Sequence, residues 1–244
     1  TFHGFCSVIL RTEARRIGLP ADFVVYDEMD SMELVTECFA GTSVKDAREI
    51  LQQMHDAKTN ATGPRLGLAV EPSVLFSVLP RERQASACAY QATLVRHHAL
   101  DFADLIFMVR AAFQDHPEIL DRWSAQFAFI QVDEVQDTHF SEYDVISRLA
   151  RGHGNLAMIG DLDQTIYEWR GSQPERIVSD FRRDFKPKEY LFADTYRASR
   201  ALVNAASTFA SGFTRRHTMC IAAETCPVGD PVVIHRAPDE NCEG

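Results

Sequence analysis

The sequence predicts an α/β fold with a parallel sheet, and three observations support this. First, residues 127–132 and 155–159 are short, nearly continuous apolar runs, typical of strands buried on both faces of a parallel sheet. Second, a helical pattern over residues 141–149 separates the two runs, which gives a βαβ unit. Third, each run ends in polar residues, beginning with Asp133 and Glu134. Ligands of open α/β sheets bind beyond the carboxyl ends of the strands, so we expect a site there.

Composition is that of an ordinary globular protein. The 244 residues are 45% hydrophobic and 25% charged, enough for one large domain or two small ones. The net charge of -10 provides no global positive field to attract nucleic acid. Any nucleic-acid binding must therefore use a local groove, stacking and backbone contacts.

The cysteines predict no disulfide framework. None of the 6 forms a Cys-x-x-Cys pair or has zinc-finger spacing with histidine, so we expect free thiols in a reducing cytosol and a cytoplasmic location. No signal peptide or membrane-length apolar run is present, and we expect no membrane partner. The chain starts with Thr1 inside a helical pattern, which suggests a fragment.

Helical patterns dominate the first half of the chain. Thr1 can cap a first helix that Gly18 and Pro20 end. Asp101 and Asp104 fall in the first turn of another helix, where carboxylates favour the dipole. The stretch from residue 21 to residue 99 is mostly helical and predicts an inserted helical subdomain. The expected helices cover residues 2–17, 43–58, 86–98, 100–114 and 117–124.

After the βαβ unit, the sequence predicts two further strands and one helix. Ser141 is the expected cap of the helix within the unit, and Gly152 closes that helix. The later strands are expected at residues 189–193 and 231–235, with a helix over residues 199–209 between them.

Asp133 and Glu134 are the main candidates for chemistry. Adjacent carboxylates at a strand end suit Mg²⁺-nucleotide chemistry: one holds the metal, and the other orients or deprotonates a water. The alternative is that the pair opens a solvated turn after a core strand, because short motifs often match by chance.

A second polar segment, residues 160–172, follows the other strand. Gln164 is positioned to contact a terminal phosphate or a water. Tyr167, Trp169 and Arg170 crowd together, as aromatic and guanidinium groups do in channels for single-stranded nucleic acid. The alternative is that both aromatic rings belong to a core.

Tyr196 and Arg197 follow the third expected strand. Tyr196 can stack on a nucleobase, and Arg197 can reach a γ-phosphate as an arginine finger. The alternative for Arg197 is a surface position before a helix cap.

Taken together, the motifs resemble those of the UvrD/PcrA/Rep family of superfamily 1 DNA helicases. They occur in the family's order, with family-like gaps, over nearly the whole chain and most weakly between residues 21 and 99. The motifs are TFHGFC (1–6), LDFADLI (100–106), VDEVQDT (132–138), IGDLDQTIYEWRGS (159–172) and TYRAS (195–199).

This resemblance implies a RecA-like parallel sheet core of the P-loop NTPase type. By similarity, residues 1–18 and 100–186 are parts of the first RecA-like domain, residues 19–99 the inserted subdomain, and residues 187–244 the truncated start of a second RecA-like domain. The implied activity is ATP-dependent 3′–5′ movement on single-stranded DNA in repair or replication, with ATP and Mg²⁺ as cofactors. The implied partners are single-stranded DNA, duplex junctions, and repair or replication proteins.

The resemblance also assigns roles in the ATP site. Asp133 helps hold Mg²⁺, and Glu134 activates the attacking water. Gln164 senses the γ-phosphate, Tyr196 stacks on adenine, and Arg197 contacts the γ-phosphate across the cleft between the RecA-like domains.

On the DNA side, the resemblance implies that Tyr167 and Trp169 stack on bases. Arg170 and His3 are expected along the same channel.

Two positions depart from the family pattern, and one motif is missing. Leu162 stands where many members carry Asp or Pro, and Thr195 replaces a common Asn. No Gly-x-x-x-x-Gly-Lys-Ser/Thr loop occurs among these residues, so the chain alone should have little ATPase and no unwinding activity. In the family, this loop precedes the TFH motif.

Two other functions stay open. Within the family, the alternative is part of a helicase-nuclease subunit, which a nuclease domain downstream would reveal. Outside the family, the alternative is a catalytically silent single-strand DNA-binding or interaction module. The presence of Asp133, Glu134, Gln164 and Arg197 argues against that module, because pure binding does not require all four.

Overall fold

A computed structural model describes residues 1–67, 71–165, 172–212 and 220–233. By their contacts, the residues divide into two compact units. Unit 1 comprises residues 1–160 and 166–186, and unit 2 comprises residues 161–165 and 187–244. The predicted domain boundaries remain predictions, since unit 1 holds the expected inserted subdomain together with the segments on either side of it.

The described chain is a mixed α/β structure that is mostly helical, with three two-stranded parallel sheets. Its helices in unit 1 are α1 (Phe2–Ile17), α2 (Glu28–Cys38), α3 (Val44–Thr59), α5 (Pro72–Leu75), η1 (Phe76–Val78), α6 (Arg81–Arg96), α7 (Phe102–Asp115), α8 (Pro117–Ser124), η2 (Val135–Asp137), α9 (Phe140–Ala150) and α10 (Pro174–Phe185). The strands of unit 1 are β1 (Val24–Val25), β2 (Ala99–Leu100), β3 (Ile130–Val132) and β4 (Leu156–Met158). Unit 2 contains η3 (Leu162–Gln164), β5 (Asp194–Thr195), α11 (Arg200–Ala210) and β6 (Ile221–Ala222).

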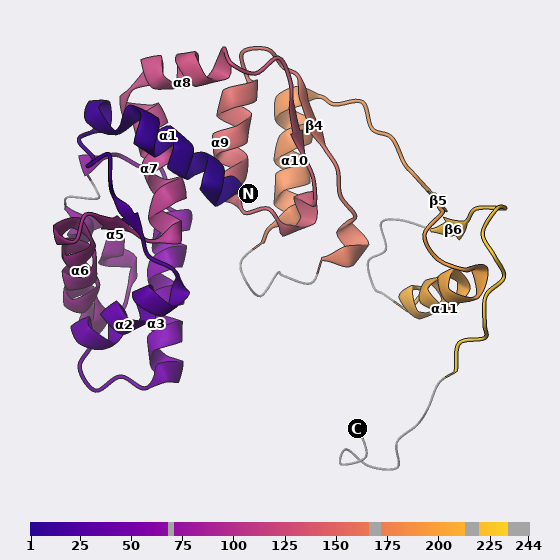
Figure 1. Cartoon of the computed structure of the whole chain (residues 1–244), viewed down its shortest axis with the longest axis horizontal. Helices are drawn as coiled ribbons and strands as arrows, with labels where there is room; N and C mark the ends of the chain where they lie inside the picture. The colour runs from indigo at the N-terminus through magenta and orange to yellow at the C-terminus, as the bar shows by residue number, and fades with distance from the viewer. Residues whose placement is uncertain (68–70, 166–171, 213–219, 234–244) are drawn as a thin grey trace. The chain divides into compact units, whose positions relative to one another are not determined.

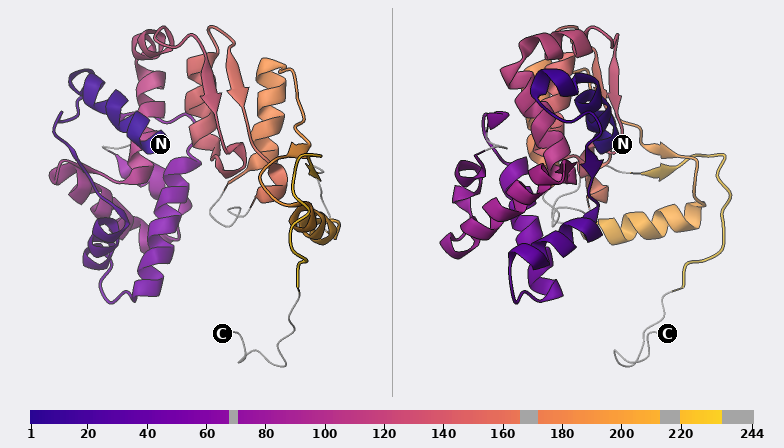
Figure 2. Two further views of the ribbon diagram at one scale, coloured as in Figure 1. Left: turned by 45° about the vertical axis from the view of Figure 1, so that its right-hand side comes forward. Right: turned by 60° about the vertical axis from the view of Figure 1, so that its left-hand side comes forward.

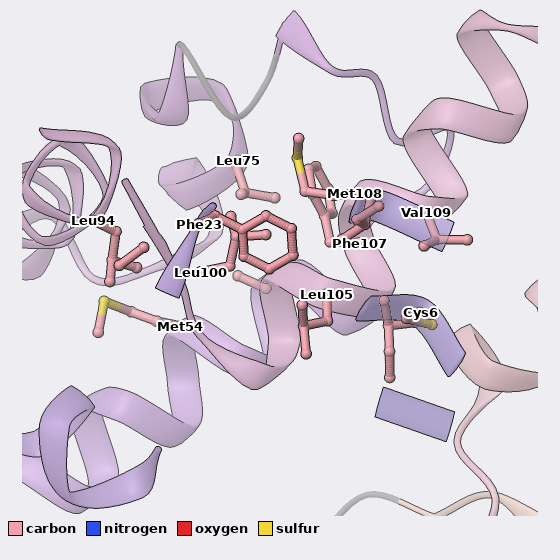
Figure 3. Close-up of a cluster of buried hydrophobic side chains, with 14 of the residues drawn as sticks. Cys6, Phe23, Met54, Leu75, Leu94, Leu100, Leu105, Phe107, Met108 and Val109 are labelled. Atoms are coloured by element: carbon pink, nitrogen blue, oxygen red, sulfur yellow. The ribbon is translucent and has the colours of Figure 1, made fainter. Parts of the chain in front are cut away.

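Helix α7 forms the centre of unit 1. Its residues 103–113 are all buried, as expected for a helix that is apolar nearly all round. Helix α1 packs across α7, with Cys6, Ile9 and Leu10 completely buried (Figure 1). Figure 3 shows the side chains of this core, drawn from α1, α3, α6 and α7. The core therefore joins the first helix, the expected inserted subdomain and α7.

The ends of the expected inserted subdomain are joined by a short sheet. Val24 pairs with Ala99 and Val25 with Leu100, in parallel. This pairing brings the chain entering α2 next to the chain entering α7. The sequence analysis did not predict these strands, because a two-residue strand leaves no periodic pattern.

Strands β3 and β4 form the predicted parallel pair, in the register Ile130–Leu156, Gln131–Ala157 and Val132–Met158. One face packs on α9 and α10 through a small core (Figure 2). The members of that core are Val135, Tyr143, Ile177 and Phe181, with Leu156, Met158 and Phe185 packed against them.

The prediction that both faces of this sheet are buried is wrong for the described chain. Gln131 and Ala157 are exposed, and so are Phe129 at 72% and Ile159 at 45%. The strands are also shorter than expected. An apolar run indicates a strand, but burial of its second face requires a covering layer, and none of the described residues forms one.

Several expected boundaries need correction. Helix α9 begins at Phe140 with His139 as its N-cap, not at Ser141. Residues 189–193 form no strand, because pairing starts one residue later, where Asp194–Thr195 meets Ile221–Ala222. Residues 231–233 also form no strand, and residues 234 and 235 lie outside the described residues.

Other local predictions are confirmed. The Thr1 side chain accepts a hydrogen bond from the Gly4 N–H, and Gly18 ends α1 in a left-handed conformation. Helix α8 covers residues 117–124 as predicted, and Ser199 caps α11. Among the described residues, no helix has both the length and the apolar character needed to cross a bilayer.

Candidate functional site

Asp133 and Glu134 directly follow β3, at the carboxyl end of the two-stranded sheet. Both are exposed. The turn that carries them is fixed by the neighbouring strand: the Ile159 N–H donates to the Val132 carbonyl at 2.8 Å, and the Val135 N–H donates to the Ile159 carbonyl at 3.0 Å. The sheet therefore presents two adjacent carboxylates to solvent at the edge where the sequence predicted a site.

The backbone of Glu134 lies in the left-handed region, with φ 53° and ψ 48°. This conformation costs a residue with a β-carbon roughly 1 kcal/mol. The Asp133 carboxylate accepts the Glu134 N–H at 3.0 Å, and the Gln136 side-chain amide donates to the Glu134 carboxylate. Glu134 is thus held in a strained conformation by contacts on both its backbone and its side chain.

Gly160, directly after β4, lies against this turn. A β-carbon at Gly160 would lie 2.5 Å from Gln136 Oε1 and 2.6 Å from Val135 Cγ1. Only glycine fits this approach. The sequence analysis gave no role to Gly160 or to Gln136, which is buried at 3% exposure, although a glycine at a strand end signals a close backbone approach.

Gln164 ends the short helix η3 and is exposed. Its side-chain amide donates to the Asp161 carboxylate at 2.8 Å, and its N–H donates to the Asp161 carbonyl at 3.0 Å. Gln164 belongs to unit 2, so its expected proximity to Glu134 in unit 1 stays a prediction.

Tyr196 and Arg197 follow β5 in unit 2, and both are exposed. Hydrogen bonds to Cys226 hold the chain on both sides of this pair. Before it, the Thr195 carbonyl accepts from the Cys226 thiol at 3.2 Å; after it, the Arg200 guanidinium donates to the Cys226 carbonyl at 3.0 Å. The two side chains predicted to contact the nucleotide therefore lie on a segment that is fixed by hydrogen bonds at both ends. Tyr167, Trp169 and Arg170 lie outside the described residues.

His3 lies in the first turn of α1 and is half-buried. Its ring meets the Phe102 ring edge-on, with 5.3 Å between the centroids. Phe102 is the first residue of α7 and is 41% exposed. Burial, together with the nearby His139 and His55, lowers the pKa of His3, so this ring is mostly neutral at pH 7. Phe102 is an exposed aromatic that the sequence analysis did not single out.

Behind Phe102 lies a buried charged cluster. The Lys58 ammonium contacts Asp101 Oδ2 at 2.6 Å and Asp104 Oδ1 at 2.8 Å, and the Lys58 side chain is 0% exposed. The Tyr90 hydroxyl donates to Asp101, and the Gln91 amide donates to Asp104. The sequence analysis explained both aspartates by the helix dipole alone. Asp101 does cap α7 and Asp104 completes the capping box, but both also neutralise a buried lysine.

Ionisation within this cluster follows from its geometry. Although burial opposes ionisation, Lys58 and the nearby His55 hold the pKa of Asp101 well below its usual range. Burial and the adjacent Asp101 charge raise the pKa of Asp104. His55 Nε2 lies 3.6 Å from Asp101 Oδ2 and is a buried atom with no hydrogen-bond partner.

Among the residues that the structure describes, no group of three or more His, Cys, Asp or Glu side chains could hold a metal. Mg²⁺ does not need such a group, since it binds proteins through one or two carboxylates. A groove of about 700 Å³ is lined by Glu37, Cys38, Ala89, Thr93, Arg96 and His97, none of which is a predicted site residue.

The first 186 residues match a known family. Residues 1–186 match the family described as the UvrD/REP helicase N-terminal domain. This chain belongs to the UvrD/REP helicase family. The carboxylates at the end of β3 and the exposed Phe102 ring beside His3 therefore belong to a chain of a helicase family.

Individual relatives agree with this assignment. The ATP-dependent DNA helicase PcrA of Leuconostoc citreum is 32% identical over 248 residues, which cover 100% of this chain and 32% of that protein. The ATP-dependent DNA helicase PcrA of Staphylococcus aureus (strain Mu50) is 31% identical over 217 residues, which cover 85% of this chain and 28% of that protein. That of Staphylococcus epidermidis is 31% identical over 216 residues, with the same coverage of 85% and 28%. The chain therefore spans about a third of the length of these relatives.

Proposed function

We propose that the intact protein is an ATP-dependent DNA helicase that moves 3′ to 5′ along single-stranded DNA in repair or replication. The observation that carries this proposal is the exposed Asp133–Glu134 pair at the carboxyl end of parallel strand β3, in a chain of the UvrD/REP helicase family. The proposal includes a RecA-like core, with residues 1–18 and 100–186 in the first domain, residues 19–99 inserted, and residues 187–244 opening a second domain; the match of residues 1–186 to the family supports the first of these domains.

In this proposal, the carboxylates divide the work of ATP hydrolysis. Glu134 accepts the proton of the water whose oxygen attacks the γ-phosphorus, while the bond from that phosphorus to the ADP oxygen breaks. The left-handed backbone of Glu134 and the Gln136 amide fix the direction of its carboxylate. Gln164 and Arg197 contact the γ-phosphate, and Tyr196 stacks on the adenine; their exposure supports these roles.

The residues present fit a magnesium ion. Asp133 is exposed, and the oxygen ligands available at the strand end are of the kind that Mg²⁺ prefers. Asp133 would hold the ion, directly or through water. When bound, Mg²⁺ neutralises charge on the β- and γ-phosphates.

The proposed single-strand contacts begin at the start of α1 and α7. The exposed Phe102 ring offers a stacking face, and the adjoining His3 ring offers a polar group beside it. Tyr167, Trp169 and Arg170 are proposed to extend this path, by the family resemblance.

The decisive experiment is Glu134→Gln in the intact protein. Gln keeps the shape but cannot accept the proton, so we expect DNA-stimulated ATP hydrolysis to fall about 10²- to 10⁴-fold while nucleotide binding is retained. Glu118→Gln, an exposed acid in the first turn of α8, is the matched control and should leave the rate unchanged. A Glu134→Gln protein that hydrolyses ATP normally would contradict the assignment.

The chain of 244 residues should behave differently from the intact protein. It contains no Gly-x-x-x-x-Gly-Lys-Ser/Thr loop, whose backbone and lysine hold the phosphates in this class of enzyme. We therefore expect little ATPase activity and no unwinding from this chain alone, measured by phosphate release with and without single-stranded DNA. Robust DNA-stimulated hydrolysis by the chain would show that this loop is not required.

A further inference from the structure

A pocket of about 390 Å³ lies at the amino ends of β3 and β4. It is lined by Asp121, Ser124, Ala125, Phe127, Gly152 and His153. These residues come from the end of α8, the segment that leads into β3, and the turn between α9 and β4. Figure 1 shows α8 at this end of unit 1. The two carboxylates proposed to act on ATP follow the carboxyl end of β3, so the pocket lies at the opposite end of this strand.

One polar atom of this pocket has no partner. The His153 Nδ1 atom accepts a hydrogen bond from the Asn155 N–H at 3.0 Å. A neutral ring in this arrangement carries its proton on Nε2. That nitrogen is buried and has no hydrogen-bond partner among the residues that the structure describes, although the side chain as a whole is only half-buried. Because a buried donor without an acceptor is unfavourable, an acceptor from another molecule would be favoured here.

The pocket also contains hydrogen-bond acceptors. Asp121 is exposed, and within the described part of the chain its carboxylate forms no ion pair or hydrogen bond. The adjacent Arg122 is engaged elsewhere, since its guanidinium binds Glu13 at 2.8 Å. The Ser124 hydroxyl donates to the Leu149 carbonyl, which leaves its own oxygen able to accept.

The backbone around the pocket favours a cation. Helices α8 and α9 both end beside it, at Ser124 and Ala150. The carbonyls in the last turn of a helix carry the equivalent of about −0.5 charge. No lysine or arginine from the described ranges lines the pocket, although the exposed Arg151 precedes Gly152. A phosphate or another anion is therefore disfavoured, and a positively charged group is favoured.

The remaining wall of the pocket is apolar. Phe127 is half-buried, and its ring meets the Phe5 ring edge-on with 5.9 Å between the centroids. A volume of about 390 Å³ is near the lower end of the range for ligand pockets, which suits one long side chain with its peptide group. The planar guanidinium of an arginine has enough N–H donors for Asp121 and Ser124 together, and it also packs well on aromatic rings.

We propose that this pocket binds one arginine side chain of a partner protein. The guanidinium would pair with Asp121 and donate to Ser124 Oγ, while the aliphatic stem would lie on Phe127. The main-chain carbonyl of the same arginine would accept the His153 Nε2–H. The net charge of -10 attracts a basic segment of this kind at long range.

This inference does not rest on the proposed function. Because the pocket and the two carboxylates after β3 lie at opposite ends of the strand, a bound partner would leave the proposed ATP site open. The pocket would then serve to recruit a partner to the protein without competing for nucleotide.

The test is the binding of a capped arginine, N-acetyl-arginine methylamide, to the intact protein, followed by saturation-transfer difference NMR. A ligand of this size should bind with a Kd of about 1 mM. N-acetyl-citrulline methylamide has nearly the same shape without the charge, and we expect it to bind about tenfold more weakly. Mg²⁺-ADP should leave the Kd of the arginine probe unchanged.

Two substitutions test the residues of the pocket. Asp121→Asn removes the charge at an exposed position and should weaken binding of the arginine probe about three- to tenfold. His153→Phe keeps a ring but removes the Nε2–H, and it should weaken binding about threefold. Glu118→Gln, an exposed acid of the same helix that does not line the pocket, is the matched control and should leave the Kd unchanged. Thermal melting of every variant separates a lost site from a lost fold.

Each result either supports or overturns the arginine pocket. Equal affinity for the arginine and citrulline probes, an unchanged Kd in Asp121→Asn, or no binding at up to about 20 mM probe overturns it and leaves the helicase proposal intact. Displacement of the arginine probe by a single-stranded oligothymidylate would show that the pocket belongs to a nucleic-acid surface, and the assignment to a protein partner would be wrong.

Discussion

At the scale of single residues, the turn after β3 depends on one residue with a strained backbone and on one glycine, which has no side chain. Glu134 adopts a left-handed backbone, and Gly160 leaves room for the Gln136 amide that contacts the Glu134 carboxylate. Strain of this kind persists only where surrounding contacts over-determine it. The direction of the Glu134 carboxylate is therefore set by residues that follow the two strands, Gln136 after β3 and Gly160 after β4.

Gly160→Ala tests this arrangement. The added carbon would overlap Gln136 and Val135, so we expect a loss of about 1–3 kcal/mol in the free energy of unfolding, measured by urea denaturation. Gly67→Ala is the control, since a β-carbon there meets nothing within 4 Å. Equal effects of the two substitutions would show that the contact with Gln136 is easily relaxed.

Glu142 provides a second test at this scale. Burial raises the pKa of Glu142 to about 7, above the ordinary value of 4.5. The contribution of Glu142 to the free energy of unfolding is therefore fully present below pH 4.5, where the carboxyl is protonated in both states, and it is lost as pH rises through 7. Gln keeps a carbonyl that can accept the His139 N–H, and it never ionises. Glu142→Gln should therefore raise the free energy of unfolding at pH 8 by roughly 1–3 kcal/mol and leave it nearly unchanged at pH 5. Urea denaturation at both pH values checks this; an effect of the same size at each would contradict the pKa.

At the scale of elements, the buried lysine connects α3 to α7. Lys58 lies in the last turn of α3. Asp101 is the N-cap of α7 and Asp104 lies in its first turn, and both also accept hydrogen bonds from α6. The expected inserted subdomain is thus tied to the helix that carries Phe102. A buried ion pair is costly to break, because the remaining charge is left without a partner.

Lys58→Met should therefore lower the free energy of unfolding by about 3–5 kcal/mol. Adding Asp104→Asn should recover part of the loss, because one unpaired charge is removed. Lys45→Met, at an exposed position of the same helix, is the control. The measurement is urea denaturation of the three variants. A Lys58→Met protein as stable as the wild type would show that the cluster makes no net contribution to the free energy of unfolding.

At the scale of the whole molecule, the two units differ in how much core each contains. Unit 1 has a continuous core around α7, whereas Val203 is the buried residue of α11 in unit 2. Large apolar side chains of unit 2 are exposed, among them Phe192 at 87% and Phe209 at 77%. Segments with few buried apolar contacts open at low free-energy cost.

Hydrogen exchange should therefore distinguish the units. We expect the amides of α11 to exchange at least 10²-fold faster than those of α7, which corresponds to a difference in opening free energy of about 3 kcal/mol. Exchange followed by mass spectrometry of peptides from both helices provides the measurement. Equal protection would mean that unit 2 is as stable as unit 1 within this chain.

Local features of the sequence determined much of the structure. The Thr1 and Ser199 caps, the Gly18 stop and the bounds of α8 depend on neighbouring residues, and the sequence predicted them. The parallel pairing of two apolar runs around a helix, with two carboxylates at a strand end, was also predictable. The order of the motifs identified the helicase family, which the comparison with residues 1–186 confirms.

Tertiary structure alone decided the features that depend on partners distant in the chain. The pairing of Lys58 with Asp101, the close approach of Gly160 to Gln136, and the contact of the His3 ring with Phe102 leave no periodic pattern. The same holds for β5, which forms at residues 194–195 because Ile221–Ala222 pairs with it there. A sequence pattern records which face of an element is apolar, whereas contacts between elements depend on how those faces pack.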